Sequence, residues 1–400
     1  MWFLLLAIGL ALLISTGLYA RRRIANALHT LGVASRTVTI ARWMIVWLLF
    51  GYPVLVIASI VTSRVRGEAT LPRFDGTVAS WLLGFPFAWA LLVVLQSALW
   101  LLAIDLGYLV LRRRRGPGLL RVRAIAVLIA VGVFAIYTPV RIVVERGDVR
   151  VRHHQLTVAQ PSTNPPFRIA FIADIQQDDH TDADRAREVY GIVNASRPDV
   201  VLSGGDWINT GPDQILPAAE AAETLTSRLG TFSVLGDHEH FAYVDRERSL
   251  DEIEQAMTRH GIAMVDNEVR WFEHHGKRIG VVLLNYNYIH RSDADTVAKL
   301  VASVADADYS IVVTHQLDRA LAAQLENKVD LVLAAHTHGG QVNPVVGVVH
   351  VNLARIETPW VDGRYQLGTT AVIATAGVGY SIIPIRYAAP GSIELIELRL

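Results

Sequence analysis

The chain has 400 residues, of which 52% are hydrophobic and none is cysteine. The hydrophobic fraction exceeds that of an ordinary soluble domain and indicates a membrane-embedded part, while the lack of cysteine excludes disulfides and thiolate metal sites. Residues 1–145 hold 15 Arg and Lys against 4 Asp and Glu, and residues 146–400 hold 22 against 33. The acidic second part argues against non-specific binding of nucleic acid, which needs a basic surface.

Residues 1–145 are predicted to form a transmembrane region of about four helices. A helix of about 20 apolar residues crosses the hydrocarbon core of a bilayer. Four runs are close to this length or longer: Trp2–Ala20, Trp43–Val61, a run within Val78–Leu111, and Ala124–Val140. The first run is not typical of a cleavable signal peptide, because no basic segment precedes it and three arginines follow it.

The charges of the loops predict the orientation. Arginines are concentrated in the first loop (Arg21 to Arg23, Arg36, Arg42) and in the third (Arg112 to Arg115, Arg121, Arg123). The positive-inside rule places both loops in the cytoplasm, so that everything after the fourth span lies on the extracytoplasmic side of the cell membrane. Asp105, within the third span, is either an interfacial carboxylate paired with the arginines that begin at Arg112 or a proton or ligand site.

The pattern changes to short apolar strands after about Val149. Residues 146–166 contain three prolines and are predicted to be a linker, and residues 167–400 are predicted to be the second domain. Apolar strands are expected at 168–174, 199–206, 231–238, 309–315 and 330–338, with helical stretches between the first four. This alternation predicts an α/β layered sheet whose ligand site lies beyond the carboxyl ends of the strands. The last three strand-like runs have no helix between them and predict an antiparallel edge or a second sheet.

Residues able to bind metal close these five strands in chain order: Asp174, Gly205-Asp206, Gly236-Asp237-His238, His315 and His336-Thr337-His338. Any one of them alone would be an ordinary cap or structural histidine. In "AHTHGGQ" the two histidines are two positions apart, so on a strand exit both imidazoles point to the same side. They can then reach two neighbouring metal ions.

This order and spacing resemble the calcineurin-like metallophosphoesterases, in particular a membrane-attached bacterial branch whose last motif is His-Thr-His-Gly-Gly-Gln. The resemblance covers residues from about 167 to 400, including the tail "AGVGYSIIPIRY", and does not extend to the four spans. It implies an α/β fold with a layered β-sandwich flanked by helices. It also implies two divalent metal ions, which could be Mn, Mg, Fe or Zn.

Carried over position by position, the resemblance implies seven metal ligands: Asp174, Gln176, Asp206, Asp237, His315, His336 and His338. Asp206 would bridge the two ions. Gln176 stands where the family carries histidine, and Asp237 stands where it carries asparagine. An amide oxygen is a weaker donor than imidazole for transition metals, and the added carboxylate gives a harder shell that favours Mn²⁺ or Mg²⁺, with Mn²⁺ preferred.

The resemblance also implies the chemistry. A hydroxide that bridges the two metal ions would attack phosphorus, and His238 would protonate the departing alkoxide. The adjacent Glu239 could orient His238, so that Asp206, His238 and Glu239 form the expected catalytic set. The substrate would be a phosphomonoester or a phosphodiester, including a phospholipid or lipid-linked phosphate near the membrane.

Two other functions stay open at this point. A non-catalytic metal-binding sensor or partner-binding module on the same fold is the first, because Gln176 and Asp237 depart from the family pattern. The second is a transporter that the soluble domain regulates, for which Asp105 is the one supporting residue.

Overall fold

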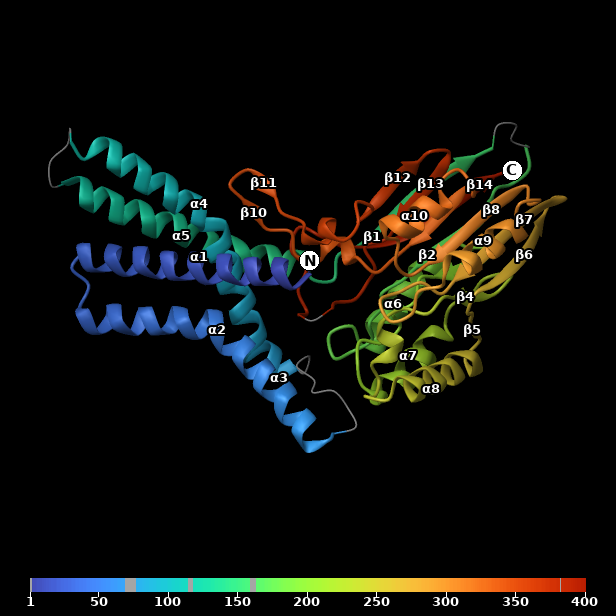
Figure 1. Ribbon diagram of the computed structural model, residues 1–400, viewed down its shortest axis with the longest axis horizontal. Helices are drawn as coiled ribbons and strands as arrows, with labels where there is room; N and C mark the ends of the chain where they lie inside the picture. Colours follow the sequence, from blue (N-terminus) through green and yellow to red (C-terminus); the bar gives the residue numbers. More distant parts are fainter. Residues whose placement is uncertain (1, 69–76, 114–117, 159–162, 382) are drawn as a thin grey trace. The chain divides into compact units, whose positions relative to one another are not determined.

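The computed structural model describes residues 2–68, 77–113, 118–158, 163–381 and 383–400, with side chains described from Ala11 onward except at Thr77 (Figure 1). The chain forms two compact units. Unit 1 comprises Met1–Thr62, Gly76–Glu145 and Asn343–Asn352. Unit 2 comprises Ser63–Asp75, Arg146–Val342 and Leu353–Leu400.

Four long apolar helices make up most of the described part of unit 1: α1 (Trp2–Thr30), α2 (Ser35–Arg66), α4 (Phe85–Leu111) and α5 (Gly118–Glu145). The short helix α3 (Thr77–Ala79) and a π-helical turn (Ser80–Gly84) directly precede α4. Among the described residues, three helical stretches are long and apolar enough to cross a membrane, namely Ser35–Arg66, Ser80–Leu111 and Gly118–Glu145. The structure therefore supports three candidate spans and not the four expected. The remaining predicted span, Trp2–Ala20, lies in α1. The side chains of about half of its residues, those before Ala11, are outside the described part. Arg21–Arg23 continue the same helix.

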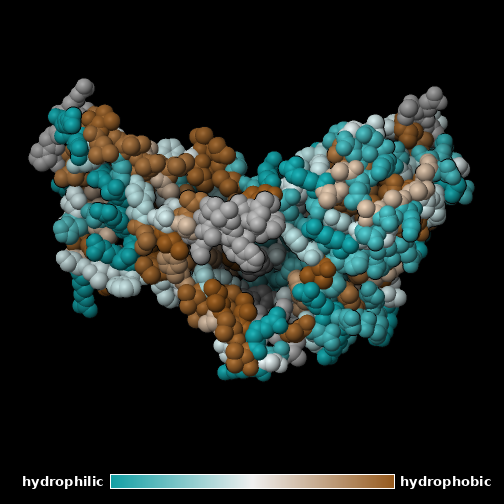
Figure 2. Space-filling view, viewed as in Figure 1, coloured by the Kyte–Doolittle hydropathy of each residue, from teal (hydrophilic) through white to brown (hydrophobic). Residues whose placement is uncertain are grey.

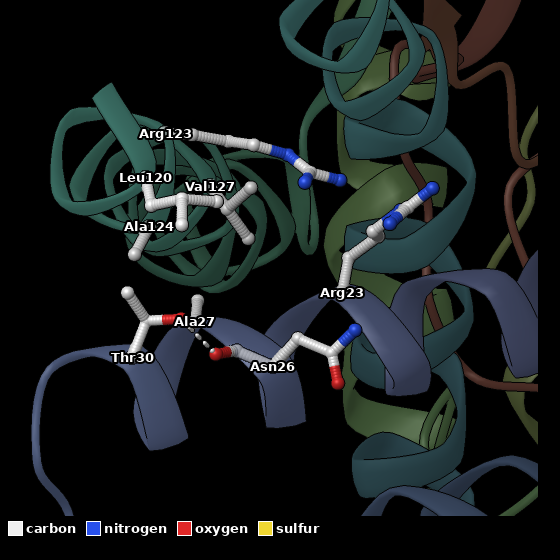
Figure 3. A pocket seen from close by; sticks show the side chains of 8 residues that line it. All are labelled: Arg23, Asn26, Ala27, Thr30, Leu120, Arg123, Ala124 and Val127. Carbon is white, nitrogen blue, oxygen red and sulfur yellow. Dashed lines mark hydrogen bonds between the residues drawn. The ribbon is translucent and has the colours of Figure 1, made fainter. Parts of the chain in front are cut away.

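An ionic cluster around Asp105 joins three of these helices. The Asp105 carboxylate, 7% exposed, accepts hydrogen bonds from Tyr19 of α1 at 2.7 Å and from Arg123 of α5 at 2.6 and 3.0 Å. Arg23 of α1 lies 2.6 Å from the same carboxylate. Figure 3 shows the side chains of Arg23 and Arg123 extending from two facing helices to the same side of the cleft between them. Asp105 is thus paired with arginines, as the first of its two predicted roles requires. These partners are Arg23 of α1 and Arg123 of α5 rather than the arginines that begin at Arg112.

Two six-stranded sheets form the centre of unit 2 within the described ranges. The first has the order β1-β14-β2-β3-β4-β5, with β1 (Val149–Thr157), β2 (Phe167–Ile172), β3 (Val200–Ser203), β4 (Thr231–Ser233), β5 (Ile262–Met264) and β14 (Gly391–Arg399). The second has the order β12-β13-β9-β8-β7-β6, with β6 (Glu268–His274), β7 (Lys277–Leu284), β8 (Tyr309–Thr314), β9 (Leu331–Ala334), β12 (Gly363–Leu367) and β13 (Thr370–Ala374).

Strand β2 shows why two layers of core form on either side of the first sheet. Successive side chains of a strand point to opposite faces. Ile169 and Phe171 pack in a cluster that also contains residues of the second sheet, such as Val281. Ala170 and Ile172 pack on the other face against helices. Because both faces are buried from Ile169 to Ile172, this part of the strand reads as a continuous apolar run.

Helices cover the outer face of each sheet (Figure 1). The helices α6 (Ala183–Ala195), α7 (Ile215–Ala222) and α8 (Arg246–Arg259) contribute to the cluster on the first sheet, and α9 (Ala294–Ser303) and α10 (Arg319–Leu325) to that on the second. Four of these five helices begin with an aspartate whose side chain accepts a backbone N–H three residues later: Asp182, Asp245, Asp293 and Asp318. Such caps satisfy N–H groups that the first helical turn leaves unpaired.

The first described strand in the chain pairs with the last. Val149–Thr157, within the segment expected to be a linker, form β1, which runs parallel to β14 from Val149 opposite Gly391 to Thr157 opposite Arg399. This pairing supplies the hydrogen-bond partners of the nine-residue strand. The three prolines of the segment lie after the strand and so do not interrupt it. Strand β14 also pairs antiparallel with β2, so the end of the chain adds the antiparallel part of the first sheet.

Candidate metal centre

Parallel strands bring the predicted ligands together. Strands β2, β3 and β4 are parallel neighbours in one sheet, and β8 and β9 are parallel neighbours in the other. Their carboxyl ends therefore lie along one edge of each sheet, and the polar residues follow at these ends. All seven predicted ligands lie within four residues after the end of a strand: Asp174, Gln176, Asp206, Asp237, His315, His336 and His338.

The backbone turns sharply at this edge. Five of the predicted ligands have positive φ angles between 48° and 73°: Asp174, Gln176, Asp206, His336 and His338. Non-glycine residues seldom adopt this conformation, and it clusters at functional sites where the surrounding structure maintains it. Neighbouring glycines make room for the turns. A Cβ atom on Gly236 would lie 2.2 Å from Oδ1 of Asp206.

Asp237, His315 and His336 form one group of potential ligands whose donor atoms all lie within 4.8 Å of one another. Oδ2 of Asp237 is 2.8 Å from Nδ1 of His336 and 3.2 Å from Nε2 of His315. The two imidazole nitrogens are themselves 3.2 Å apart. Asp237 therefore faces both histidines and can bind the same cation.

Two acceptors orient the histidines of this group. Nδ1 of His315 lies 2.7 Å from the carbonyl oxygen of Gly204 and must donate to it, which leaves Nε2 free to bind a metal ion. Nε2 of His336 lies 3.2 Å from Oε1 of Glu357, which directs Nδ1 toward Asp237. A carboxylate or carbonyl behind a histidine is the usual arrangement for metal ligands in proteins.

The charges in this group shift its pKa values strongly. Burial lowers the pKa of His336, but the hydrogen bonds to Asp237 and Glu357 outweigh it and raise the pKa to about 9. Burial likewise opposes the charged form of Glu357, but the contact with His336 lowers its pKa to about 2. Without a cation, protons on the histidines balance the negative charge of the carboxylates. A divalent metal ion can replace these protons, because it binds neutral imidazoles and charged carboxylates, and the site therefore fits such an ion.

Asp174, Asp206 and His315 form a second group, also within 4.8 Å, so that His315 belongs to both groups. Burial, together with the charge of Asp206, raises the pKa of Asp174 to about 6 although the neighbouring histidines act against it. Two buried carboxylates this close require a cation or a proton between them. His338 belongs to neither group, and its contact is with Gln176.

Gln176 occupies the space between Asp206 and His338. Its amide nitrogen lies 3.0 Å from Oδ2 of Asp206 and 3.2 Å from Nε2 of His338. Two buried polar atoms here have no hydrogen-bond partner among the described residues, namely Oε1 of Gln176 and Nδ1 of His338. Because a buried unpaired polar atom costs about 1–3 kcal/mol, a cation engaged by these side chains would remove an energetic penalty. The residues on this side therefore also fit a metal ion.

His238 stands at the edge of the centre. It is half-buried, and its Nδ1 lies 2.6 Å from the carbonyl oxygen of Asn209. A carbonyl only accepts hydrogen bonds, so Nδ1 carries a proton and Nε2 is the atom left for a substrate. Its backbone N–H donates to Oδ1 of Asp206 at 2.8 Å, which ties the position of His238 to the residue expected to bridge the metal ions.

Glu239 has a different role from the expected one. The prediction that it orients His238 is wrong, because its carboxylate accepts three backbone N–H groups, those of Asp206, Trp207 and Gly236, at 2.6–2.9 Å. The residue that orients His238 is Asn209, through its backbone carbonyl. Burial, together with the charge of Asp206, raises the pKa of Glu239 to about 7. Glu239 thus holds the turn that carries Asp206 rather than the imidazole next to it.

The sequence pattern does not predict the contact of Glu357 with His336 or that of the Asn209 backbone carbonyl with His238. Glu357 lies in an irregular segment 19 residues after His338 and follows no apolar strand, so no sequence pattern marks it. Asn209 acts through its backbone, which any residue would supply. Arg386, a candidate phosphate ligand by charge, is 1% exposed and donates to four backbone carbonyls, including that of His338 at 3.2 Å. Its role in the structure is to hold the loops of the site.

Residues 167–340 match the family model described as calcineurin-like phosphoesterase. The matched segment includes both candidate ligand groups. It is 25% identical over 278 residues to the uncharacterized metallophosphoesterase Cj0846 of Campylobacter jejuni, with 68% of each chain covered. It is 26% identical over 248 residues to a transmembrane protein with metallophosphoesterase domain of Danio rerio, with 60% of this chain and 54% of that protein covered.

The solved structures that resemble the chain are distant. A hypothetical protein from Thermus thermophilus aligns with 55% of this chain and 88% of its own, at 17% identity and a TM-score of 0.34. The phosphoesterase domain and the candidate ligand groups therefore rest on the family match and on the geometry of this chain.

Proposed function

We propose that this protein is a membrane-anchored, metal-dependent phosphoesterase of the membrane-attached branch named above, which hydrolyses a phosphomonoester or phosphodiester. The observation that carries the proposal is the convergence of two buried ligand groups, Asp237/His315/His336 and Asp174/Asp206/His315, within the phosphoesterase domain. The ligands of these groups follow five strands of two different sheets. If each residue only stabilised its own turn, the five side chains would not need to meet at one place.

In this proposal seven residues hold two divalent metal ions: Asp174, Gln176, Asp206, Asp237, His315, His336 and His338. When bound, the ions supply Lewis acidity and positive charge for the phosphoryl group and for the attacking water. Asp206 belongs to the second ligand group, and its Oδ2 lies 3.6 Å from Nε2 of His315, the residue that both groups share, and 3.0 Å from the amide nitrogen of Gln176. Three carboxylates offset most of the charge of two divalent ions and favour oxygen-preferring Mn²⁺ over Zn²⁺.

His238 is proposed to protonate the leaving group. Its Nδ1 proton is committed to the carbonyl of Asn209, so it can deliver a proton from Nε2 only as an imidazolium. The half-buried position lets Nε2 meet a substrate from solvent. Glu239, by fixing the backbone of Asp206 and Gly236, keeps the segment from which His238 projects in place.

The helices of unit 1 are proposed to anchor the enzyme in the cell membrane, with the phosphoesterase domain on the extracytoplasmic side. The three candidate spans and the arginine-rich loops support this. Because the chain has no cysteine, Asp184→Cys, at a side chain 90% exposed, gives a single label site in unit 2. A membrane-impermeant maleimide should label it in intact cells. Labelling only after permeabilisation would place the domain in the cytoplasm.

Hydrolysis by the purified full-length protein tests the activity. In Mn²⁺, the protein should hydrolyse p-nitrophenyl phosphate or bis-p-nitrophenyl phosphate, and Asp206→Asn should abolish the reaction. His275→Ala, at an exposed histidine of unit 2, is the matched control and should retain it. A folded, metal-loaded protein that hydrolyses neither ester would refute the proposal.

One observation favours a second candidate, a non-catalytic metal-binding module. The amide nitrogen of Gln176, rather than an imidazole, faces Asp206 and His338, which weakens the side of the site that includes His338. Such a module would bind one ion tightly per chain, and His238→Ala would leave its cellular phenotype unchanged. The enzyme requires two ions and an effect of that substitution.

A further inference from the structure

Strands β10 (Val345–Val346) and β11 (Val349–His350) form a short hairpin that belongs to unit 1, with the candidate membrane spans. Val345 pairs with His350 and Val346 with Val349. At the base of the hairpin, the N–H of Val351 donates to the carbonyl of Pro344 at 2.9 Å. Gly347 has a φ of 68°, the left-handed conformation that a two-residue hairpin turn needs. The hairpin pairs only part of its backbone internally, and open sheet edges do not occur in the hydrocarbon region of a bilayer, so the side chains at its tip, and not its strands, are the part suited to contact acyl chains.

The tip of this hairpin is apolar and uncovered. Val348 is 90% exposed and Val349 60%. The segment Asn343–Asn352 contains no Lys, Arg, Asp or Glu. Burying a valine side chain is worth about 1.5–3 kcal/mol, so two adjacent exposed valines at a turn favour an apolar environment over water.

The hairpin lies against α4. A Cβ atom at Gly347 would lie 3.1 Å from Cδ1 of Leu99, and α4 belongs to the candidate span Ser80–Leu111. Leu99, Trp100 and Leu102 of this helix are 46–47% exposed. In Figure 2 the hydrophobic surface over the hairpin continues over α4. The apolar tip thus extends the surface that α4 would present to acyl chains.

Both ends of the hairpin segment lead to the metal centre. His338 precedes Asn343 by five residues in the chain. After the hairpin the chain returns to Glu357, whose Oε1 lies 3.2 Å from Nε2 of His336. The segment that contacts the candidate span is therefore inserted between two residues of the site.

We propose that the hairpin Asn343–Asn352 inserts Val348 and Val349 among the acyl chains of the bilayer that α4 crosses, and that the substrate is a phosphate ester carrying acyl chains in the same bilayer. The second part rests on the proposed function. The first part depends only on the hairpin and α4, so the two are tested separately.

Depth-dependent quenching tests the insertion. Val348→Cys in the otherwise cysteine-free full-length protein is labelled with an environment-sensitive fluorophore in phosphatidylcholine vesicles. Nitroxides on the acyl chains should quench this label, and aqueous iodide should not. The same label at Asp184→Cys, exposed on α6, should show the opposite pattern. Quenching of the Val348 label by iodide alone, or by neither quencher because a second copy of the chain covers the tip, would overturn the proposal.

Activity on two substrates tests the substrate class. In phosphatidylcholine vesicles that contain phosphatidic acid or phosphatidylglycerol, the wild-type protein should hydrolyse the added lipid. Val348→Ser with Val349→Ser should lower that rate at least tenfold and leave hydrolysis of bis-p-nitrophenyl phosphate unchanged. Equal losses on both substrates, or a wild-type protein active only on the soluble ester, would overturn the substrate class. A protein inactive on every ester whose tip is quenched by acyl-chain nitroxides would refute the proposed function and leave the insertion intact.

Discussion

The side-chain amide nitrogen of Gln176 lies 3.0 Å from Oδ2 of Asp206, at the position where the resemblance to the calcineurin-like metallophosphoesterases implies an imidazole. Because histidine adopts positive φ angles more readily than most residues, Gln176→His should add no backbone strain at the φ of 48° that Gln176 already has. An imidazole is a better donor than an amide oxygen for Mn²⁺ and Zn²⁺, so we expect the more weakly held of the two ions to bind on the order of tenfold more tightly. Calorimetric titration of the metal-free protein with Mn²⁺ measures this.

The matched control is Gln176→Leu, which keeps the volume and removes the oxygen. It should weaken the same binding step and leave the step at Asp237, His315 and His336 unchanged. If Gln176→His and Gln176→Leu bind both ions as the wild type does, Gln176 does not face a metal ion.

His238→Ala should lower kcat about 10²–10⁴-fold, the usual range for loss of a general acid. The count of bound metal ions should stay the same, because His238 is not among the seven proposed ligands and its Nδ1 contacts the carbonyl of Asn209. The defect should shrink with esters whose leaving groups are more acidic, since these need less protonation. A uniform loss across leaving groups, accompanied by loss of metal, would instead assign His238 to metal binding.

Glu357→Gln should weaken metal binding at His336 by about 10–100-fold, the range typical for residues that orient a metal ligand. The substitution keeps the shape but removes the charge that contributes to the raised pKa of His336. The pH dependence of metal binding should therefore shift to lower pH. Glu326→Gln, at an exposed glutamate, is the control and should change neither property.

Metal affinity should rise with pH up to about 9. In the metal-free protein the carboxylates of Asp237 and Glu357 outweigh burial and raise the pKa of His336 from 6.5 to about 9. A metal ion binds the neutral imidazole, so each pH unit below 9 should cost at least about tenfold in affinity. The same raised pKa stabilises the metal-free fold below pH 6.5, and this contribution is lost as pH rises through 9. Competition with a chelator of known protonation constants measures the first effect, and thermal unfolding without metal measures the second.

Asp105→Asn should destabilise unit 1, because it leaves Arg23 and Arg123 without their shared carboxylate. Breaking a buried ion pair by removing one partner costs about 3–5 kcal/mol, and partial exposure of the two arginines reduces this figure. The melting temperature in detergent should fall, while hydrolysis of a soluble ester by the remaining folded protein should persist. Glu68→Gln, in a largely exposed pair with Arg66, should have little effect.

The strand ends could be predicted from the sequence because each is an apolar run followed by a metal-binding residue. Asp174, Asp206 and His315 illustrate this. Contacts made by irregular segments could not be predicted, since the acceptor on His336 comes from Glu357 and that on His238 from a backbone carbonyl. Adjacency in sequence was misleading for Glu239, whose side chain turns back to three backbone N–H groups instead of toward its neighbour.

Pairing between distant segments also escaped the sequence pattern. Strand β1 has its hydrogen-bond partner about 240 residues later in β14, and the prolines nearby favoured a linker. The partners of Asp105 come from α1 and α5, because helix packing rather than sequence distance decides which arginines reach it.

The most direct test of a shared dinuclear centre is a crystal structure of the full-length protein soaked in MnCl₂, read by anomalous scattering at the manganese edge. The account predicts two peaks, one bound by Asp237, His315 and His336 and one bound by Asp174 and His338, with the carboxylate of Asp206 in contact with both. A single peak that Asp206 does not touch, or no peak at these residues, would contradict it.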